Sequence, residues 1–416
     1  MHNLFQGTAK YMFKTIWADK LSKEDLKIIQ STVDAITVPT SLGRIPRKIA
    51  SSFSSFTSDQ WMNWTLYFSA IALKDVLGKQ DYSCWLHFVE ACRSLCKPSL
   101  SIRDIRHGHE KLMLFCRTFE KLYGSNAVTP NMHLHTHLIE CILDYGPIHS
   151  FWLFSFERMN GILGSFNTNQ RSPEIQFMRN IVKGHAILNM PEPQDLSSLF
   201  AESLAFRKTT ASKVKNTEVV IRLQNLSAGE VKRGIEWIQD ADINYIGTMH
   251  DGSLTEHLLR FLQDATKCFI DVSDFQISGN CQKYFSMEMC GERYGSSSSR
   301  LQRSSIVLAS WCGPEGEINT TGSDIRPGII RYFVTFFIKI RERFVPVHFA
   351  FVHWWQRVPY HFSPLVSLWC RNIFEPEGPA CFLPVQRIVS KAVCAPVKVK
   401  NENVVAVIPH IRQLYH

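Results

Sequence analysis

The sequence predicts a multidomain α+β protein with a mainly helical N-terminal half and a small antiparallel β barrel or sandwich at the C-terminus. From residue 1 to about 125, apolar residues recur at steps of three and four, as on one face of a helix. From about residue 291, β-branched and aromatic residues partly alternate, as in strands. A chain of 416 residues also exceeds one ordinary hydrophobic core. We therefore expect three regions: 1–185, 186–290 and 291–416.

The helical region carries recognisable helix starts and one helix stop. Helical periodicity is found in LSKEDLKIIQSTVDAI, DQWMNWTLYFSAIALKDVL and HEKLMLFCRTFEKLYG. Ser22 with Asp25, and Thr57 with Gln60, have the spacing of capping pairs at helix N-termini. Gly124 stands at a C-cap position. We expect helices to begin near Ser22 and Thr57 and another to end near Gly124.

The C-terminal region contains a series of short strand-like segments. The longest are IIRYFVTFFIKI and FVPVHFAFVHWW, which are separated by a polar turn. VSLWC, ACFLPVQRIV and NVVAVIPHI continue the series. This pattern is typical of a small antiparallel barrel or sandwich. Region 186–290 is predicted to be a linker with short helices, one of them over SLTEHLLRFLQDATKCF.

Composition indicates a folded, soluble protein of the nucleus or cytoplasm. Hydrophobic residues make up 45% of the chain and aromatic residues 12%, which excludes global disorder. The net charge of +9 permits an anionic partner without requiring one. No signal peptide and no uncharged apolar run of about 18 residues is found, so we expect neither secretion nor a membrane span. Twelve cysteines in such a chain are expected to be reduced thiols.

Residues 129–178 are the most informative stretch. It begins TPNMHLHTHL, with three histidines at alternate positions, and passes through a Gly-Pro break to an aromatic run. A Gly- and Asn-rich tail follows. A plain core helix does not need Phe154, Phe156, Glu157 and Arg158 in so short a span. We therefore expect a present or ancestral function in this stretch.

Four segments then follow one another over roughly residues 1–180: MHNLFQGTAKYM, VPTSLGRIPRKI, SSFTSDQWMNW, and the block from TPNMHLHTHL to FERMNGILGSF. In these segments the chain resembles transposases of the CACTA (En/Spm) type, and the last block is the most specific. RPGIIRYF, HFAFVHWW and CFLPVQRI resemble an accessory domain that often accompanies such proteins.

The resemblance implies a DDE/D transposase with an RNase H-like fold. Such enzymes bind two Mg²⁺ ions through three carboxylates and carry out phosphoryl transfer on DNA at transposon ends. The FERMNG segment matches the helix of the third carboxylate, which assigns that role to Glu157. Region 1–185 would then hold the helical insertion and the last catalytic helix.

The chain departs from the family pattern at its first residue. In that pattern the second catalytic aspartate lies just upstream of the Met-His-Asn segment, and the first lies further upstream. Asp34, Asp59 and Asp144 do not match these positions. We therefore expect a truncated, catalytically inactive protein with an incomplete RNase H-like sheet in residues 1–180. An upstream start that restored both aspartates would instead give an active transposase.

Two pairs of potential metal ligands share helical spacing. Cys92 and Cys96 are four residues apart, and so are His133 and His137. Together they could form a structural Zn²⁺ site. The alternative interpretation is buried thiols and hydrogen-bonded histidines.

Several basic residues could contact DNA phosphates. The candidates are Arg44, Arg47 and Lys48 in the Pro- and Gly-punctuated loop, Arg158 beside the proposed catalytic glutamate, and Lys208, Lys213 and Lys215. A solvated charged face is the alternative. No helix-turn-helix, finger or zipper pattern predicts readout of base sequence.

The aromatic residues of the β domain allow a hypothesis of a different class. Trp354, Trp355, Tyr360 and Trp369 could line a cage for a peptide or a methyl-lysine. The chain would then be a domesticated module that binds protein or chromatin. The alternative is that these rings form the core of the β domain.

Overall fold

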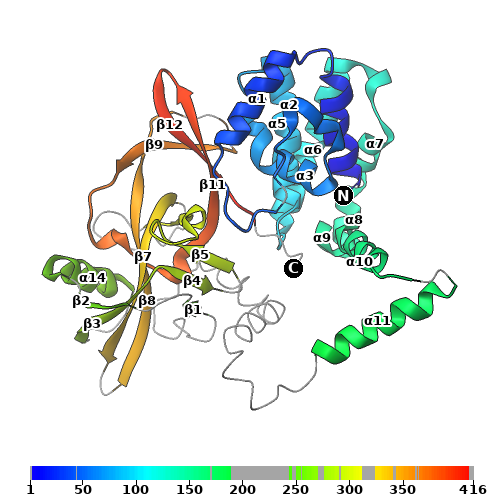
Figure 1. Cartoon of the computed structure of the whole chain (residues 1–416). Coiled ribbons are helices and arrows are strands. Elements are labelled where there is room, and N and C mark those ends of the chain that lie inside the picture. The colour runs from blue at the N-terminus through cyan, green and yellow to red at the C-terminus, as the bar shows by residue number, and fades with distance from the viewer. Residues whose placement is uncertain are drawn as a thin grey trace.

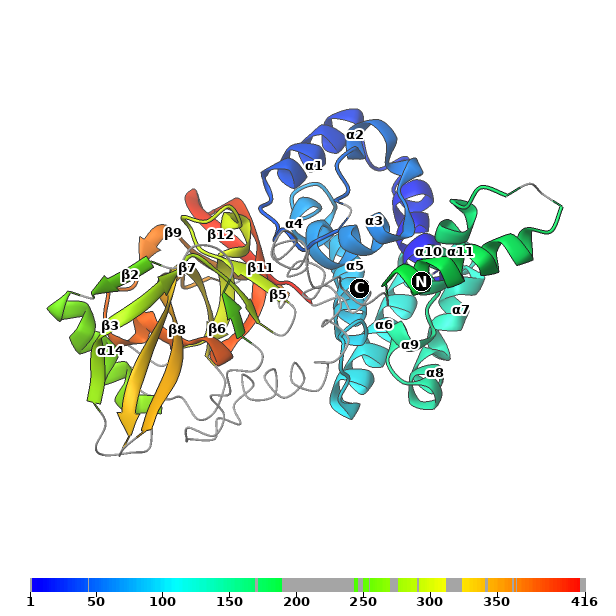
Figure 2. The same ribbon diagram turned by 60° about the horizontal axis from the view of Figure 1, so that its bottom comes forward.

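The computed structural model describes residues 2–43, 45–168, 171–188, 243–245, 250–253, 255–269, 276–289, 292–311, 324–340, 343–360, 363 and 365–411. The N-terminal residues form a helical unit, and the C-terminal residues form a β unit beside it (Figures 1 and 2). The fold is therefore a mixture of a helical N-terminal half and a C-terminal antiparallel sheet. Among the described helices, none is both long and apolar enough to cross a membrane.

The helical unit consists mainly of α-helices. They are α1 Lys23–Ala35, α2 Ile49–Ser52, α3 Ser58–Asn63, α4 Ser69–Ala72, α5 Lys79–Leu95, α6 Ile102–Tyr123, α7 Pro130–Thr136, α8 Leu138–Tyr145, α9 Ile148–Phe151, α10 Phe154–Gly164 and α11 Pro173–Leu188. Shorter helical segments of other types are η1 His2–Ala9, η2 Met12–Ile16 and η4 Trp64–Phe68, which are π-helical, and η3 Phe53–Ser55 and η5 Ser125–Ala127, which are 3₁₀.

The helix boundaries follow local capping chemistry. Ser22 and Thr57 each form a capping box at the start of α1 and α3, and Gly124 ends α6 with φ at 84°. These three predictions are confirmed. Ser101 forms a further capping box with Asp104 at the start of α6. Each box satisfies backbone N–H groups that have no partner inside the helix.

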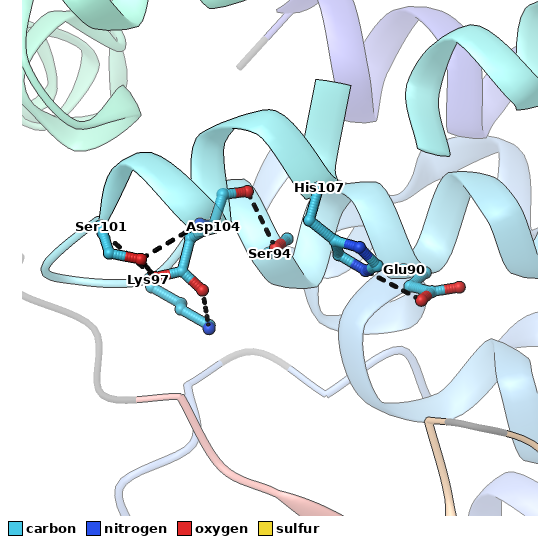
Figure 3. A network of polar contacts seen from close by, with 6 residues as sticks. All are labelled: Glu90, Ser94, Lys97, Ser101, Asp104 and His107. Atoms are coloured by element: carbon cyan, nitrogen blue, oxygen red, sulfur yellow. Dashed lines mark hydrogen bonds and ion pairs between the residues drawn. The ribbon is translucent and has the colours of Figure 1, made fainter. Parts of the chain in front are cut away.

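A polar network joins α5 to α6 near their connecting turn (Figure 3). Glu90 accepts hydrogen bonds from His107 at 3.0 Å and from Lys111 at 2.9 Å. The backbone carbonyl of Asp104 accepts a hydrogen bond from Ser94 Oγ at 3.2 Å. Gly108 lies at the point where the two helices approach most closely, because a Cβ there would be 2.5 Å from Leu95 Cγ.

The β unit contains twelve strands and one long helix in the described residues. The strands are β1 Ile243–Tyr245, β2 His250–Ser253, β3 Gln276–Tyr284, β4 Ser286–Met289, β5 Glu292–Gly295, β6 Ile306–Ser310, β7 Ile325–Ile340, β8 Arg343–Arg357, β9 Ser367–Phe374, β10 Phe382–Pro384, β11 Ile388–Val399 and β12 Glu402–Pro409. The helix is α14 Glu256–Phe269, and the short 3₁₀ turns are η10 Gln302–Ser304, η11 Pro379–Cys381 and η12 Val385–Arg387.

All pairings between the described strands are antiparallel. Nine strands follow the order β10-β8-β9-β12-β11-β6-β7-β3-β2, and β7 also pairs with β8. The strands β1, β4 and β5 form a separate three-stranded sheet. Every segment that the sequence predicted as a strand contributes to this unit, and the helix predicted near 253–269 is α14.

The β unit begins earlier in the sequence than the boundary predicted at residue 291. Strands β1 to β4 lie within the region predicted as a linker, and β3 pairs with β7 in the main sheet. These strands are short, or broken by a register shift between Ile277 and Cys281, and are rich in polar residues. The alternation of apolar and polar residues in these strands is therefore too weak to predict them from the local sequence. Strand β3 owes its conformation to pairing with the long strand β7.

One hydrophobic core is shared by the two units. Trp17, Trp61 and Trp85 of the helical unit belong to the same cluster of buried residues as Val393 and Ile408 of the β unit. A two-residue bridge also joins them, since Thr37 N donates to Cys394 O at 2.7 Å and Cys394 N to Thr37 O at 2.9 Å. Over the described residues 2–188 this bridge is the single β pairing, and no sheet forms there.

The close approach at Gly108 leads to a stability prediction. Gly108→Ala forces Leu95 to move in a packed core, which costs about 1–3 kcal/mol and outweighs the gain of up to about 1 kcal/mol in helix propensity. We expect the free energy of unfolding, measured in urea, to fall by about 1–2 kcal/mol. Gly161→Ala in α10 is the matched control, because nothing lies within 4 Å of its Cβ position. Equal unfolding free energies for the two variants would contradict this packing.

Candidate functional site

The first part of the stretch 129–178 is anchored in the core by His135. Pro130 starts α7 at a position where its missing N–H costs nothing. His135 is fully buried, with its Nε2 3.2 Å from Thr8 Oγ1 and its Nδ1 3.7 Å from Cys116 Sγ. Burial lowers the pKa of His135 to about 3, so its imidazole is neutral at physiological pH. Its role in this geometry is to connect helices.

Segments that are far apart in the sequence contact one another directly in the helical unit. Asn3 Nδ2 donates to Asn131 O at 2.9 Å, and Tyr11 OH donates to Ala127 O at 3.0 Å. Gln60 Nε2 donates to Ile45 O at 3.3 Å. Because η1 also packs on α3, the N-terminal segment, the segment around Ile45, α3 and α7 form one packed body.

Glu157 lies in the first turn of α10, and its side chain is exposed. The positive end of the helix dipole favours a carboxylate at this position. Arg158 is exposed beside it. Phe156, Met159 and Ile162 of the same helix are 63%, 51% and 44% exposed. In Figure 1, α10 and α11 lie at the lower edge of the helical unit.

The four residues of the predicted zinc site are not brought together. Cys92 is fully buried on α5, and burial raises its pKa and raises that of Cys96 to about 12. His133 and His137 are exposed on and beside α7, and His137 Nδ1 lies 3.2 Å from Glu140 Oε2. Among the described residues, no three or more His, Cys, Asp or Glu side chains gather as a metal site. The thiols here belong to the hydrophobic core.

The described basic residues that were predicted to contact DNA lie on two different elements. Arg47 and Lys48 are exposed on the segment before α2, and Arg158 is exposed on α10. The remaining candidates lie outside the described residues: Arg44, Lys208, Lys213 and Lys215.

Arg47 lines a cleft of about 680 Å³ between the helical and β units. One wall comes from the C-terminal end of α1 and the segment that follows it. The other wall comes from η10, the first residue of β6 and Ile329 of β7. Arg303 lines the β-unit side. Sequence reasoning did not find Arg303, because its relation to Arg47 depends on the contact between units.

A buried polar cluster at the same junction was also not predicted. Tyr67 OH donates to Ile411 O and accepts from Ile411 N, both at 3.1 Å. The buried Arg93 donates to Leu66 O at 3.3 Å and to Pro409 O at 3.4 Å. Burial lowers the pKa of Arg93 to about 10.

His410 completes this cluster at the end of β12. Its ring stacks on Tyr67 with centroids 5.5 Å apart, and neither ring nitrogen has a hydrogen-bond partner among the described residues. Burial lowers the pKa of His410 to about 4, although Glu292 nearby favours the charged form. The residues of the cluster are up to 344 positions apart in sequence, so no local pattern marks them.

The three tryptophans of the proposed cage belong to the core, and Tyr360 is half-buried. Trp354, Trp355 and Trp369 are 1%, 5% and 2% exposed. Trp354 Nε1 donates to Ala380 O at 2.8 Å, and Tyr360 OH donates to Glu402. Packed tryptophans of this kind cannot enclose a ligand, so the core interpretation of these rings is confirmed.

The chain matches no protein-family model, no curated protein and no solved structure.

The two buried histidines predict acid sensitivity. A histidine that is neutral when buried binds fewer protons in the folded state than in the unfolded state, so stability falls as pH drops from about 6.5 towards its folded pKa. For His410, with a folded pKa of about 4, the full effect corresponds to roughly 3 kcal/mol. We expect His410→Phe to keep the stacking on Tyr67 and to show a shallower loss of unfolding free energy between pH 6.5 and 4. Parallel pH profiles for the variant and the wild type would refute this assignment.

Proposed function

We propose that this chain is a transposable-element-derived protein of the CACTA type that associates with DNA and does not itself catalyse phosphoryl transfer. The observation that supports this proposal is that the first three of the segments resembling the family and the TPNMHLHTHL part of the fourth pack against one another. Their contacts join residues up to 128 positions apart, as in the bond from Asn3 to Asn131. Because these segments build one packed body, there is a physical reason why a chain that contains one of them also contains the others.

The proposed DNA contacts are electrostatic. Arg47 and Lys48 are exposed next to each other, and the chain carries a net charge of +9. Such residues bind phosphates without reading base sequence and release counterions when they do so. Arg158 on α10 is the third proposed contact.

Glu157 is proposed to occupy the position of the third carboxylate of an RNase H-like active site. A two-Mg²⁺ site needs three convergent carboxylates, whereas Glu157 lies exposed on α10 and belongs to no metal-ligand group among the described residues. The described residues therefore do not fit that pair of ions, and we assign no catalytic step to them.

The β unit is proposed to be a small barrel. The support is a closed circuit of strand pairings, in which β8, β9, β12, β11, β6 and β7 each pair with the next and β7 pairs again with β8. A nuclear location follows from the proposed DNA association.

The DNA proposal is tested by the salt dependence of binding. We expect the full chain to bind duplex DNA with an affinity that falls linearly in a plot of log affinity against log salt. Arg47→Gln/Lys48→Gln should reduce the steepness of that slope by about 1–2 and weaken binding about tenfold at low salt. The matched control is Lys23→Gln/Lys27→Gln, which removes two exposed lysines from α1. Absence of binding by the wild type at low salt, or equal effects of the two double variants, would reject this surface.

The absence of catalysis is tested on DNA carrying transposon-like terminal repeats. With Mg²⁺ or Mn²⁺ present, we expect no strand cleavage or strand transfer above a protein-free reaction, and the same result for Glu157→Gln. Metal-dependent cleavage that Glu157→Gln abolishes would show that the chain assembles a complete active site.

A further inference from the structure

The cleft between the two units has the dimensions and position of a ligand site. Its volume of about 680 Å³ lies within the range of small-molecule pockets, which often form where two packed units meet. The lining comes from both units, with Ile36, Ile45 and Arg47 on one side and Arg303, Ile306 and Ile329 on the other.

The two walls of the cleft are fixed relative to each other. Thr40 N donates to Ser304 Oγ at 3.1 Å, and the two hydroxyl oxygens lie 2.8 Å apart. Lys391 Nζ donates to Ser41 Oγ at 2.8 Å, and the Thr37–Cys394 bridge lies in the same region. A ligand would therefore meet a preformed site and would lose little affinity to reorganisation.

The polar groups of the cleft favour an anion. Arg47 and Arg303 are exposed, and neither side chain has a hydrogen-bond or ion-pair partner among the described residues. Asp34 is the one carboxylate in the lining, and it accepts a hydrogen bond from Gln30 Nε2 at 3.0 Å. The oxygen Ser297 Oγ is buried and has no partner in the described part of the chain. Guanidinium and hydroxyl groups together bind carboxylate or phosphate oxygens.

The rest of the lining favours an aliphatic ligand body. Ile45, Ile306 and Ile329 are only half-buried, so part of each side chain is available to the cleft. Val33, Ile36 and Val38 also line the cleft and are buried. None of the described lining residues is aromatic, so the cleft offers no ring on which a nucleobase could stack.

We propose that this cleft binds a small amphipathic anion, with an aliphatic body against the isoleucines and a carboxylate or phosphate head near Arg47 and Arg303. Binding of this anion is separate from the proposed binding of DNA. Arg47 takes part in both proposals, whereas Arg303 takes part only in anion binding. A variant of Arg303 therefore tests the cleft without altering the proposed DNA contacts.

The test is isothermal titration of the full chain with n-octyl phosphate and with n-octanoate. We expect at least one of them to bind, and the tighter of the two identifies the preferred head group. Inorganic phosphate and 1-octanol, which carry only the head or only the body, should bind at least about tenfold more weakly because each lacks half of the contacts. Equal binding of 1-octanol would overturn the role of the arginines.

Two arginine variants provide the matched comparison. Arg303→Gln should weaken binding of the preferred anion at least about fivefold, because it removes a charge-assisted hydrogen bond. Arg300→Gln removes an exposed arginine three residues away that does not line the cleft, and should change affinity less than twofold. Circular dichroism of both variants checks folding.

Equal affinities in the two variants would refute the site. So would complete displacement of the anion by a short DNA duplex, which would assign the cleft to the DNA surface. The Arg47→Gln/Lys48→Gln experiment judges the DNA proposal independently, since Arg303→Gln leaves both of those residues intact.

Discussion

The insertion of the end of β12 into the helical unit is the contact on which the rest of the structure depends. Tyr67 holds the backbone of Ile411 through two hydrogen bonds, and Arg93 holds the carbonyl of Pro409. Buried polar groups of this kind are expensive to leave unpaired, so the two units are constrained to one relative position. The shared core and the fixed walls of the cleft are consequences of that constraint. We expect the two units to unfold together because neither can expose this surface alone.

Much of the fold could be predicted because its causes are local. The capping boxes at Ser22 and Thr57 and the stop at Gly124 each depend on residues within one helical turn. The long strands β7 and β8 carry enough alternating aromatic and β-branched residues to be recognised. Strand β3 carries too few, and it acquires its conformation from pairing with β7. The predicted boundary at residue 291 was therefore too late.

The candidate site was harder to predict because spacing does not determine the direction of a side chain in the folded protein. Cys92 and His133 have suitable helical partners, yet Cys92 faces the core and His133 faces solvent. The middle histidine, His135, is the buried one, because its face of α7 packs on Phe88 and Phe115. Arg303 and His410 carried no local signal, since their environments are created by residues hundreds of positions away.

The exposure of α10 affects how firmly the side chain of Glu157 is positioned. The helix is short and carries Gly161 and Gly164, and it is tied to the core through Phe154, whose ring lies 5.0 Å from that of Trp152. An 11-residue helix with few tertiary contacts is marginally stable in water. The position of the Glu157 carboxylate is therefore set by a helix that is itself weakly held by the rest of the protein. A second surface that covered Phe156 and Met159 would supply the missing rigidity, so order at this residue depends on what the helix touches.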